Sequence, residues 1–243
     1  MSKKIAIVSG ASRGLGKEIA IDLAKQNYIV IITYVKNSAR AEEVADYIKE
    51  LGGEALTVKA DVANYSEVDY LFKTVKTQFG HIDAVINTAG VAILKPLEEF
   101  TTDEFESVIN TNLIGSFNIL NQAAKHVDQG GRVVTFSSNV VDSIPVNYGP
   151  YAASKAAVEI LSKTLSKELR GKQITVNIIS PGPTATDMFL EGKTPEAIEH
   201  FSKLSPFERL GTPNDIVNVL RFLLSNEATW VNGQVIKVNG GAN

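Results

Sequence analysis

The chain lacks cysteine altogether and has little histidine, which excludes several kinds of chemistry at once. Among 243 residues there is no Cys, so disulfides, thiol catalysis and cysteine-based zinc sites are all ruled out. The three histidines, His81, His126 and His200, lie far apart and show none of the short spacings of metal ligands. We interpret them as surface or structural residues and expect no metal site.

An excess of one charge is missing too, as is any long apolar run. The chain has 24 Lys and Arg against 27 Asp and Glu, a formal net charge of -3, and no long basic run. This balance argues against nucleic acid or an anionic membrane as a partner. No apolar stretch approaches the ~20 residues of a membrane span, and the first residues show no signal-peptide pattern. The sequence therefore predicts a soluble, cytoplasmic protein without a membrane partner.

Short apolar runs alternate with longer amphipathic segments, and hydrophobic residues make up 44% of the chain, enough for a sizeable core. That alternation is typical of βα units that build a parallel sheet. The absence of a repeat or linker favours one domain over residues 1–243, an α/β domain with a Rossmann-type, doubly wound sheet covered by helices on both faces. We expect seven strands, at residues 5–8, 29–32, 55–58, 84–86, 133–136, 176–179 and 235–238.

Helix starts and stops are marked between these strands. Thr101 and Ser66 each stand three residues before a carboxylate, as in a capping box. Thr212 precedes a proline, which suits an N-cap followed by the first helical residue. Glycines stand where helices should end, at positions 52, 53, 80, 130, 131 and 171.

Gly10, Gly14 and Gly16 directly follow the first predicted strand and open the first helix. Glycine lets the backbone turn sharply and approach a pyrophosphate without a Cβ in the way. The N–H groups and the positive end of the helix then favour the anion. The spacing is Gly-x-x-x-Gly-x-Gly rather than the usual Gly-x-Gly-x-x-Gly, so this loop alone indicates either a dinucleotide site or a tight turn.

The end of the second strand indicates which dinucleotide would bind. A NAD site typically carries an acidic residue there, and residues 32–40 contain none. Arg13, Lys36 and Arg40 offer positive charges suited to an added phosphate. The alternative is that Lys36 and Arg40 belong to an ordinary solvated helix start. The missing acid favours NADP over NAD.

Tyr151 and Lys155 stand four residues apart on a helix predicted at 151–169, so they are neighbours on one face. A nearby ammonium favours the phenolate, and we expect the pKa of Tyr151 to lie below its ordinary value of about 10. Seven tyrosines and 24 Lys and Arg make one such pair expected by chance, so an ordinary tyrosine at a helix start is the alternative.

Ser138 lies just past the fifth predicted strand, where open α/β sheets place their ligands. Its hydroxyl suits a hydrogen bond to a carbonyl oxygen that is being polarised. Ser137 is the rival candidate, and strand alternation points the two side chains in opposite directions.

Taken together, these segments make the chain resemble the short-chain dehydrogenase/reductase family. Their order and number make the resemblance specific, and it covers nearly the whole chain. Ser9 and Thr88 depart from the family's commoner residues, and the bond from position 88 to a neighbouring strand is expected to differ. The matching segments are residues 9–16, 61–62, 87–90, 112–115, 137–138, 151–155, 181–187 and 238–241.

The resemblance implies a catalytic role for four residues. Tyr151 is the general acid/base, and Lys155 lowers its pKa and holds the nicotinamide ribose. Ser138, selected over Ser137 by its interval to the tyrosine, orients the substrate oxygen, and Asn112 supports a water that links the lysine to solvent. The implied NADP(H)-binding residues are Gly10, Ser12, Arg13, Gly14, Leu15, Gly16, Lys36, Asp61, Val62, Asn87, Ala89, Gly90, Tyr151, Lys155, Pro181, Gly182, Thr184 and Thr186.

The resemblance also implies an activity, reduction of a small or carrier-linked ketone by NADPH, most like that of β-ketoacyl-acyl-carrier-protein reductases. Alternatives are a reductase of polyhydroxynaphthalene-type or other small ketones, NAD-linked alcohol oxidation, and a dinucleotide-sensing protein without catalysis. Residues 140–150 and 188–206 are expected to form a substrate wall and lid, with a flap or a plain surface loop at 192–195. A homotetramer is implied, in which helices at 102–127 and 151–169 pair across one interface.

Overall fold

Seven short apolar segments form one parallel sheet in the computed structural model, which describes residues 3–242. The strands follow the order β3-β2-β1-β4-β5-β6-β7, and every neighbouring pair is parallel. The predicted Rossmann-type sheet and all seven predicted strands are thereby confirmed. The strands are β1 (Lys4–Ser9), β2 (Tyr28–Tyr34), β3 (Glu54–Lys59), β4 (Ala84–Asn87), β5 (Arg132–Phe136), β6 (Thr175–Pro181) and β7 (Val235–Val238).

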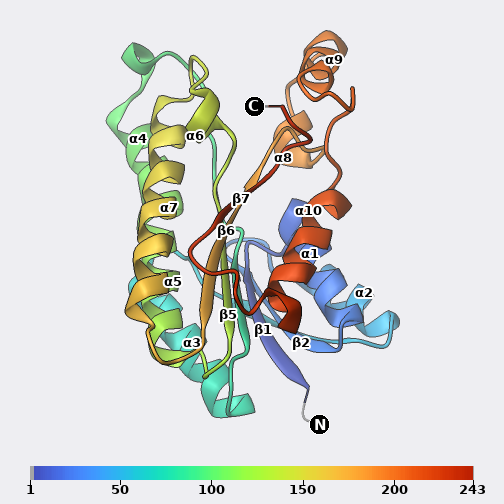
Figure 1. Cartoon of the computed structure of the whole chain (residues 1–243), viewed down its shortest axis with the longest axis vertical. Coiled ribbons are helices and arrows are strands. Elements are labelled where there is room, and N and C mark those ends of the chain that lie inside the picture. The colour runs from blue at the N-terminus through green and yellow to red at the C-terminus, as the bar shows by residue number, and fades with distance from the viewer. Residues whose placement is uncertain (1–2, 243) are drawn as a thin grey trace.

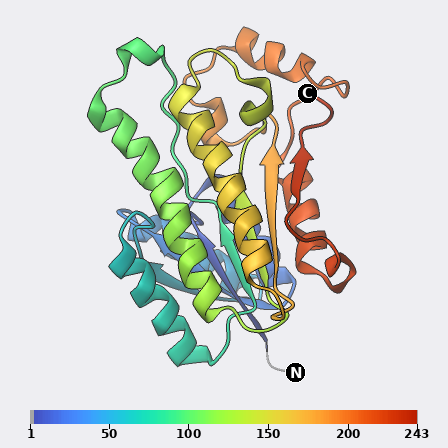
Figure 2. The same cartoon turned by 60° about the vertical axis from the view of Figure 1, so that its left-hand side comes forward.

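Helices cover both faces of this sheet, and each face has its own apolar core (Figures 1 and 2). In β1, Ala6 and Val8 pack into one core while Ile5 and Ile7 pack into the other, because successive side chains point to opposite faces. The first core is covered by α1 (Gly14–Lys25), α2 (Ser38–Glu50) and α10 (Pro213–Leu224), and the second by α3 (Tyr65–Phe79), α5 (Gly115–His126) and α7 (Gly149–Glu168).

Most of the predicted helix starts are found where the sequence places them. Thr101 and Thr212 each form a capping box, with Glu104 and Asp215 respectively. The capping box predicted at Ser66 is wrong: Asn64 caps α3, and its side chain accepts from the backbone N–H of Ser66. An asparagine at this position satisfies a free N–H group as well as a hydroxyl does, so the helix begins two residues earlier than a Ser66 cap requires.

The long helix predicted at 102–127 is interrupted by a wider turn. It consists of α4 (Thr102–Ile109), a π-helical turn η2 (Asn110–Ile114) and α5. A π-turn adds a residue to the helical repeat and often occurs at functional sites. Asn112 lies at the middle of this one.

The carboxyl ends of the strands point towards the end of the molecule that carries the short helices (Figure 1). Ligands of open α/β sheets bind at this edge, at the point where the strand order reverses, here between β1 and β4. No helix within residues 3–242 has the length and apolarity that a membrane crossing requires. The remaining helices are η1 (Leu97–Glu99), α6 (Val140–Ser143), α8 (Asp187–Leu190), α9 (Pro195–Lys203) and η3 (Asn226–Ala228).

Candidate active site

The end of β5 meets the first turns of α7, and three of the predicted catalytic residues come together there. A hydrogen bond joins the side chains of Ser138 and Tyr151. Lys155 Nζ donates to the carbonyl oxygen of Phe136 at 3.0 Å. Because Tyr151 and Lys155 are one helical turn apart, the lysine Nζ also lies 5.7 Å from the centre of the Tyr151 ring. A hydroxyl, a phenol and an ammonium therefore share one small region.

Ser137, the rival of Ser138, points elsewhere. Its Oγ is buried and donates to Glu159 Oε1 at 2.6 Å, whereas Ser138 is partly exposed. Both hydroxyls contact the same helix, α7, at different residues, so the opposite directions expected from strand alternation are not found in this segment beyond the end of β5. Only Ser138 is directed at Tyr151.

The protonation of the pair differs from the expectation of a more acidic phenol. Burial raises the pKa of Tyr151, the hydrogen bond from Ser138 lowers it in part, and nearby Tyr148 raises it again. Burial also lowers the pKa of Lys155 to about 8, because the ammonium is removed from water. The net shift of the Tyr151 pKa is upward because the loss of water outweighs the hydrogen bond from Ser138, while Lys155 donates to the Phe136 carbonyl.

Asn112 is held rigidly in the π-turn beside the lysine. Its Oδ1 accepts from the N–H of Val91 at 2.8 Å, and its Nδ2 donates to the carbonyl oxygen of Val91 at 2.9 Å and to Ser154 Oγ at 3.0 Å. A Cβ added to Gly90 would lie 3.4 Å from both Asn112 Oδ1 and Lys155 Nζ. The fourth predicted catalytic residue is therefore a close neighbour of the lysine, and the loop after β4 and helix α7 fix its amide.

The glycine loop after β1 packs closely against the start of α1 and the loop after β4. Gly10 and Gly14 have φ values of +70° and +54°, which favour glycine. A Cβ at Gly16 would come within 2.6 Å of Thr88 Oγ1, so the loop and the helix can approach only without side chains. No side chain caps α1 at Arg13, which leaves its first turn suited to an anion. The predicted residues Ser12 and Leu15 lie partly exposed in this loop.

Hydrogen bonds between polar residues connect the ends of β1 and β4, where the two loops begin. Ser9 Oγ donates to Asn87 Oδ1, and Asn87 Nδ2 donates to Ser116 Oγ at 2.9 Å. Thr88 Oγ1 donates to the carbonyl oxygen of Ser9, which is a bond to the neighbouring strand. The side chain of Asn87 is 4% exposed and fully engaged inside the fold, so it braces the site from within. Ala89 and Gly90 are partly exposed beside it.

Three positive side chains stand near the end of β2 and the glycine loop. Arg13, Lys36 and Arg40 are exposed, and within residues 3–242 no ion pair involves any of them. Asn37 Oδ1 accepts from the N–H of Arg40 at 3.0 Å, so Arg40 lies in the first turn of α2. These charges remain available for an anionic group.

The remaining predicted binding residues differ in how far their side chains are exposed to solvent. Asp61, which the resemblance sets beside the adenine with Val62, accepts from the N–H of Ala63 at 2.9 Å, while Val62 is buried against α5. Thr184 is buried, and its Oγ1 donates to the carbonyl oxygen of Gly182 at 2.8 Å. Partly exposed positions at the end of β6 are Pro181, Gly182 and Thr186.

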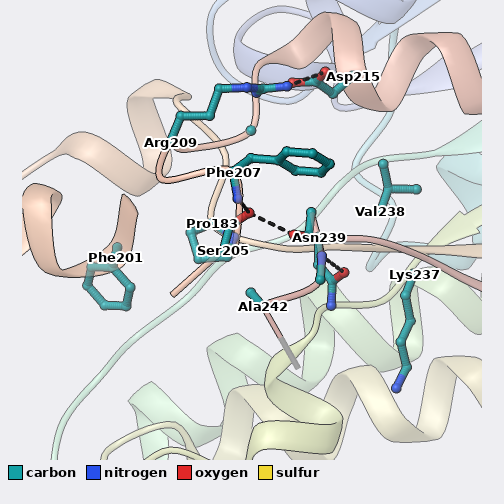
Figure 3. Close-up of a pocket in the computed structure, with 13 residues that line it drawn as sticks. Pro183, Phe201, Ser205, Phe207, Arg209, Asp215, Lys237, Val238, Asn239 and Ala242 are labelled. Atoms are coloured by element: carbon teal, nitrogen blue, oxygen red, sulfur yellow. Dashed lines mark hydrogen bonds and ion pairs between the residues drawn. The ribbon is translucent and has the colours of Figure 1, made fainter. Parts of the chain in front are cut away.

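A cavity of about 360 Å³ is lined by Pro183 of the loop that follows β6 and by segments later in the chain (Figure 3). Phe201 and Phe207, from the predicted lid and the segment after it, line one part, and Val238 and Asn239 line another. None of the four predicted catalytic residues is among the lining residues. Pro183 belongs to its wall, so the cavity and the predicted cofactor loop share a boundary. The sequence analysis did not find this cavity.

Sequence reasoning also missed residues that hold the catalytic groups. Ser154 connects Asn112 to α7, and Ser116 connects the π-turn to Asn87. Glu159 binds Ser137. The one available signal was spacing, since Glu159 stands one further helical turn beyond Tyr151 and Lys155.

Comparison with known proteins shows the family of the chain. A family model described as "Enoyl-(Acyl carrier protein) reductase" matches residues 10–243. A short-chain type dehydrogenase/reductase of Picea abies is 44% identical over 98% of this chain and 92% of its own. The chain belongs to the short-chain dehydrogenase/reductase family. It is therefore an oxidoreductase of the CH–OH/C=O class, as predicted.

Further relatives have narrower names. An NADPH-dependent aldehyde reductase-like protein of Arabidopsis thaliana, described as chloroplastic, is 38% identical over 99% of this chain and 94% of its own. A hydroxynaphthalene reductase-like protein of Metarhizium acridum is 38% identical over 100% and 96%.

Solved structures are similar throughout. A short-chain dehydrogenase of Burkholderia cenocepacia in complex with NADP has a TM-score of 0.93 and 33% identity, covering 99% of this chain and 98% of its own. An angucycline C-6 ketoreductase with bound NADP has a TM-score of 0.92 and 34% identity, covering 98% and 95%.

Proposed function

We propose that the protein is an NADPH-dependent carbonyl reductase that acts on small, uncharged ketones or aldehydes. The observation that carries this is the cluster of Ser138, Tyr151 and Lys155 at the carboxyl end of β5. NADPH, when bound, supplies the hydride that reduces the carbonyl carbon. Tyr151 gives its phenolic proton to the carbonyl oxygen, and Ser138 orients that oxygen by a hydrogen bond. The ammonium of Lys155 stabilises the phenolate that remains.

The protonation of the site supports reduction over alcohol oxidation. A proton donor must hold its proton at working pH, and burial raises the pKa of Tyr151. Oxidation of an alcohol requires the phenolate as a base, which this environment disfavours near neutral pH. The presence of Asn112, Ser138, Tyr151 and Lys155 also argues against a dinucleotide sensor, because a protein that only senses the dinucleotide has no need of a proton relay.

The residues of the glycine loop and the end of β2 fit NADP(H). The glycine residues let the loop backbone come close to a bound phosphate, and α1 begins directly after the loop. Arg13, Lys36 and Arg40 are exposed, and within residues 3–242 none of them forms an ion pair. A guanidinium group suits the dianion that distinguishes NADP from NAD. Relatives described as NADPH-dependent or solved with NADP support the same choice.

Replacing Arg13 tests the choice of cofactor. Arg13→Ala should lower kcat/KM with NADPH about tenfold or more, the loss of one charge-assisted contact, and leave kcat/KM with NADH nearly unchanged. Arg170→Ala replaces an exposed arginine in the turn that follows α7; it is the control and should change neither. Equal losses with both cofactors would contradict a phosphate-binding role.

The surroundings of the site favour a free apolar substrate over a carrier-linked one. Exposed apolar side chains gather on the segments expected to form the substrate wall and lid, with Ile144 at 76%, Val146 at 86% and Met188 at 51% exposure. Cations of the neighbouring segments are already paired with acids: Lys95 with Glu104, Lys237 with Asp142 and Arg209 with Asp215. An acidic carrier protein would find few free positive charges there. The named relatives, aldehyde and hydroxynaphthalene reductases and a ketoreductase, point the same way.

A substrate panel tests this proposal. Oxidation of NADPH is followed with an aromatic ketone, an aldehyde, a small diketone, an acetoacetyl thioester on acyl-carrier protein, and a crotonyl thioester. We expect the highest kcat/KM for one of the free carbonyl compounds. A preference for the acetoacetyl thioester on acyl-carrier protein would contradict the proposal and favour a β-ketoacyl-acyl-carrier-protein reductase. Turnover of the crotonyl thioester alone would indicate an enoyl reductase, in keeping with the description of the matching family model.

We propose one NADP-binding domain over residues 1–243 that assembles as a homotetramer. All seven strands join one sheet, and the outer faces of the long helices carry exposed apolar side chains: Phe105, Ile114, Phe117 and Ile160. Ala153 is exposed, and Ala152, Ala156 and Ala157 are partly exposed, so these alanines do not pack fully onto their own sheet. The cytoplasmic location stays a prediction, since one relative is described as chloroplastic.

A further inference from the structure

Three consecutive residues at the end of β5 each contact a different residue of α7. The carbonyl oxygen of Phe136 accepts from Lys155, the hydroxyl of Ser137 donates to Glu159, and the hydroxyl of Ser138 bonds with Tyr151. Two of these contacts belong to the catalytic cluster. The third, between Ser137 and Glu159, lies between them in the strand sequence and has no place in the chemistry proposed above.

Glu159 continues the line of Tyr151 and Lys155 by one helical turn. The four-residue spacing sets all three on one face of α7, with Lys163 another turn further on. Only 13% of the Glu159 side chain is exposed. Its Oε1 accepts from Ser137 at 2.6 Å, and its Oε2 lies 3.7 Å from Lys163 Nζ. A carboxylate this enclosed is retained only with good partners, and Ser137 is the closer one.

The contact between Ser137 and Glu159 bears on the neighbouring Ser138. Backbone bonds from Ser137 N–H to the carbonyl oxygen of Ile179 and from Asn139 N–H to that of Pro181 hold the chain against β6, at 2.8 and 3.0 Å. Because a peptide group is planar, the first of these bonds also sets the direction of the Phe136 carbonyl. Apart from Tyr151, the Ser138 hydroxyl has only a 3.5 Å contact with the N–H of Val140. An anchor for the Ser137 side chain on α7 therefore restrains the backbone from which the Ser138 hydroxyl projects.

We propose that Glu159 is a positioning residue for the reaction, which acts by binding the Ser137 hydroxyl and so aligning Ser138 with Tyr151. This inference rests on the proposed carbonyl reductase. The effect is geometric rather than electrostatic, since burial accounts for the lowered pKa of Lys155. An uncharged acceptor of the same shape should then replace the carboxylate.

Four variants of the full chain separate these roles in NADPH-dependent reduction of a small ketone. Ser137→Ala and Glu159→Leu remove the contact from either side, Glu159→Gln keeps an acceptor oxygen without charge, and Lys163→Ala removes only the ion pair. We expect the first two to lower kcat about tenfold with KM for NADPH within about twofold, since small misalignments are costly in a proton transfer. Glu159→Gln and Lys163→Ala should stay within about threefold of the wild type.

The double variant Ser137→Ala/Glu159→Leu should be no slower than the slower single variant, because both remove one contact. Full additivity, or a wild-type kcat in Ser137→Ala, would overturn the proposal. An equal loss in Glu159→Gln and Glu159→Leu would assign the effect to charge and overturn it too. If Glu159→Leu fails to fold, Ser137→Ala carries the test alone.

A titration that needs no turnover keeps this test separate from the proposed function. The pKa of Tyr151 is measured by NMR on protein with labelled tyrosine rings, and Tyr151→Phe identifies its signal. The bond from Ser138 lowers this pKa, so its misalignment in Ser137→Ala and Glu159→Leu should move the pKa further up. Unchanged titration in both variants would refute the positioning role. A wild type that reduces no carbonyl compound would refute the proposed function instead.

Discussion

Lys155 combines a catalytic position with an unfavourable environment. Its side chain is 6% exposed, and burial lowers its pKa from 10.5 to about 8. The hydrogen bond to the Phe136 carbonyl offsets only part of the lost hydration. A buried ammonium of this kind destabilises the folded state at neutral pH, a cost commonly found at active sites.

Replacing this lysine should therefore stabilise the fold and abolish activity. Between pH 8 and pH 10.5 the unfolded chain holds the lysine proton and the folded chain releases it, so the contribution of this group to stability rises with pH. Lys155→Met should raise the free energy of unfolding at pH 7 by up to about 3 kcal/mol, and the gain should shrink near about pH 10. Urea unfolding of both proteins at the two pH values measures it. A variant less stable than the wild type at pH 7 would contradict the assignment.

At the residue scale, the sequence predicted which side chains meet but not their protonation. Four-residue spacing on a helix is enough to place Tyr151 beside Lys155. Strand alternation did not place Ser137 and Ser138, because both follow the end of β5 and both contact α7. The direction of the Tyr151 shift depends on how much water the fold removes, which no local pattern contains. The contact of Glu159 was not predicted for a similar reason, because its partner Ser137 lies 22 residues away in the chain.

In the proposed function, cofactor binding depends on the glycine loop. Gly10 packs against the loop after β4, where an added Cβ would lie 3.0 Å from Ala89 Cα. Gly16 is tighter still, because an added Cβ would meet the Gly10 carbonyl oxygen and Thr88 Oγ1. The loop and the helix are thus pressed together at the reversal of strand order.

A single methyl group should test this packing. Gly16→Ala should cost roughly 1–3 kcal/mol of stability through overcrowding and weaken NADPH binding by displacing the loop. Gly149→Ala is the matched control, since its Cβ would meet only Leu97 Cδ1 at 3.8 Å, an ordinary contact. Thermal unfolding and fluorescence titration with NADPH measure both effects. Unchanged affinity in Gly16→Ala would argue against a phosphate site in this loop.

At the element scale, strands and most caps followed from the sequence, whereas the π-turn did not. Apolar runs and glycine stops are local signals, and they placed the strands within two residues at either end. The turn at Asn110–Ile114 is stabilised by distant partners: Asn112 binds Val91 and Ser154, and Ser116 binds Asn87. The pattern of residues 102–127 alone is that of an uninterrupted helix.

The whole molecule exposes an apolar surface over its long helices. Phe105 of α4, Phe117 of α5 and Ile160 of α7 are 44%, 47% and 63% exposed, and α7 contacts both other helices. Exposed apolar patches are uncommon on monomeric proteins and often mark an interface. The same face of a second copy would remove these side chains from water.

A charge on this surface should break the assembly. Phe117→Glu should reduce the mass in solution from about four chains of 26.2 kDa to a smaller assembly, because an unpaired carboxylate would be buried in the interface. Tyr70→Glu places the same charge on an exposed aromatic of α3 and should leave the mass unchanged. Sedimentation velocity distinguishes the outcomes. A wild-type protein of one-chain mass would contradict the tetramer directly.

At the scale of the molecule, the sequence predicted the sheet and the family but not the cavity whose wall includes Pro183 of the loop after β6. Its walls come from segments near residues 183, 201–215 and 237–242, which meet only in the folded chain (Figure 3). Hydrophobic periodicity reports which face of an element is buried, and a cavity between loops leaves no such pattern.

The proton transfer from Tyr151 is the central claim, and removal of one oxygen atom tests it most directly. In Tyr151→Phe, kcat for NADPH-dependent ketone reduction should fall by at least about a thousandfold, while the Kd for NADPH changes by less than about threefold. Tyr148→Phe, which removes the neighbouring phenol with its ring 6.4 Å away, should keep kcat within about threefold. A Tyr151→Phe protein with the kcat of the wild type would show that the proton comes from elsewhere.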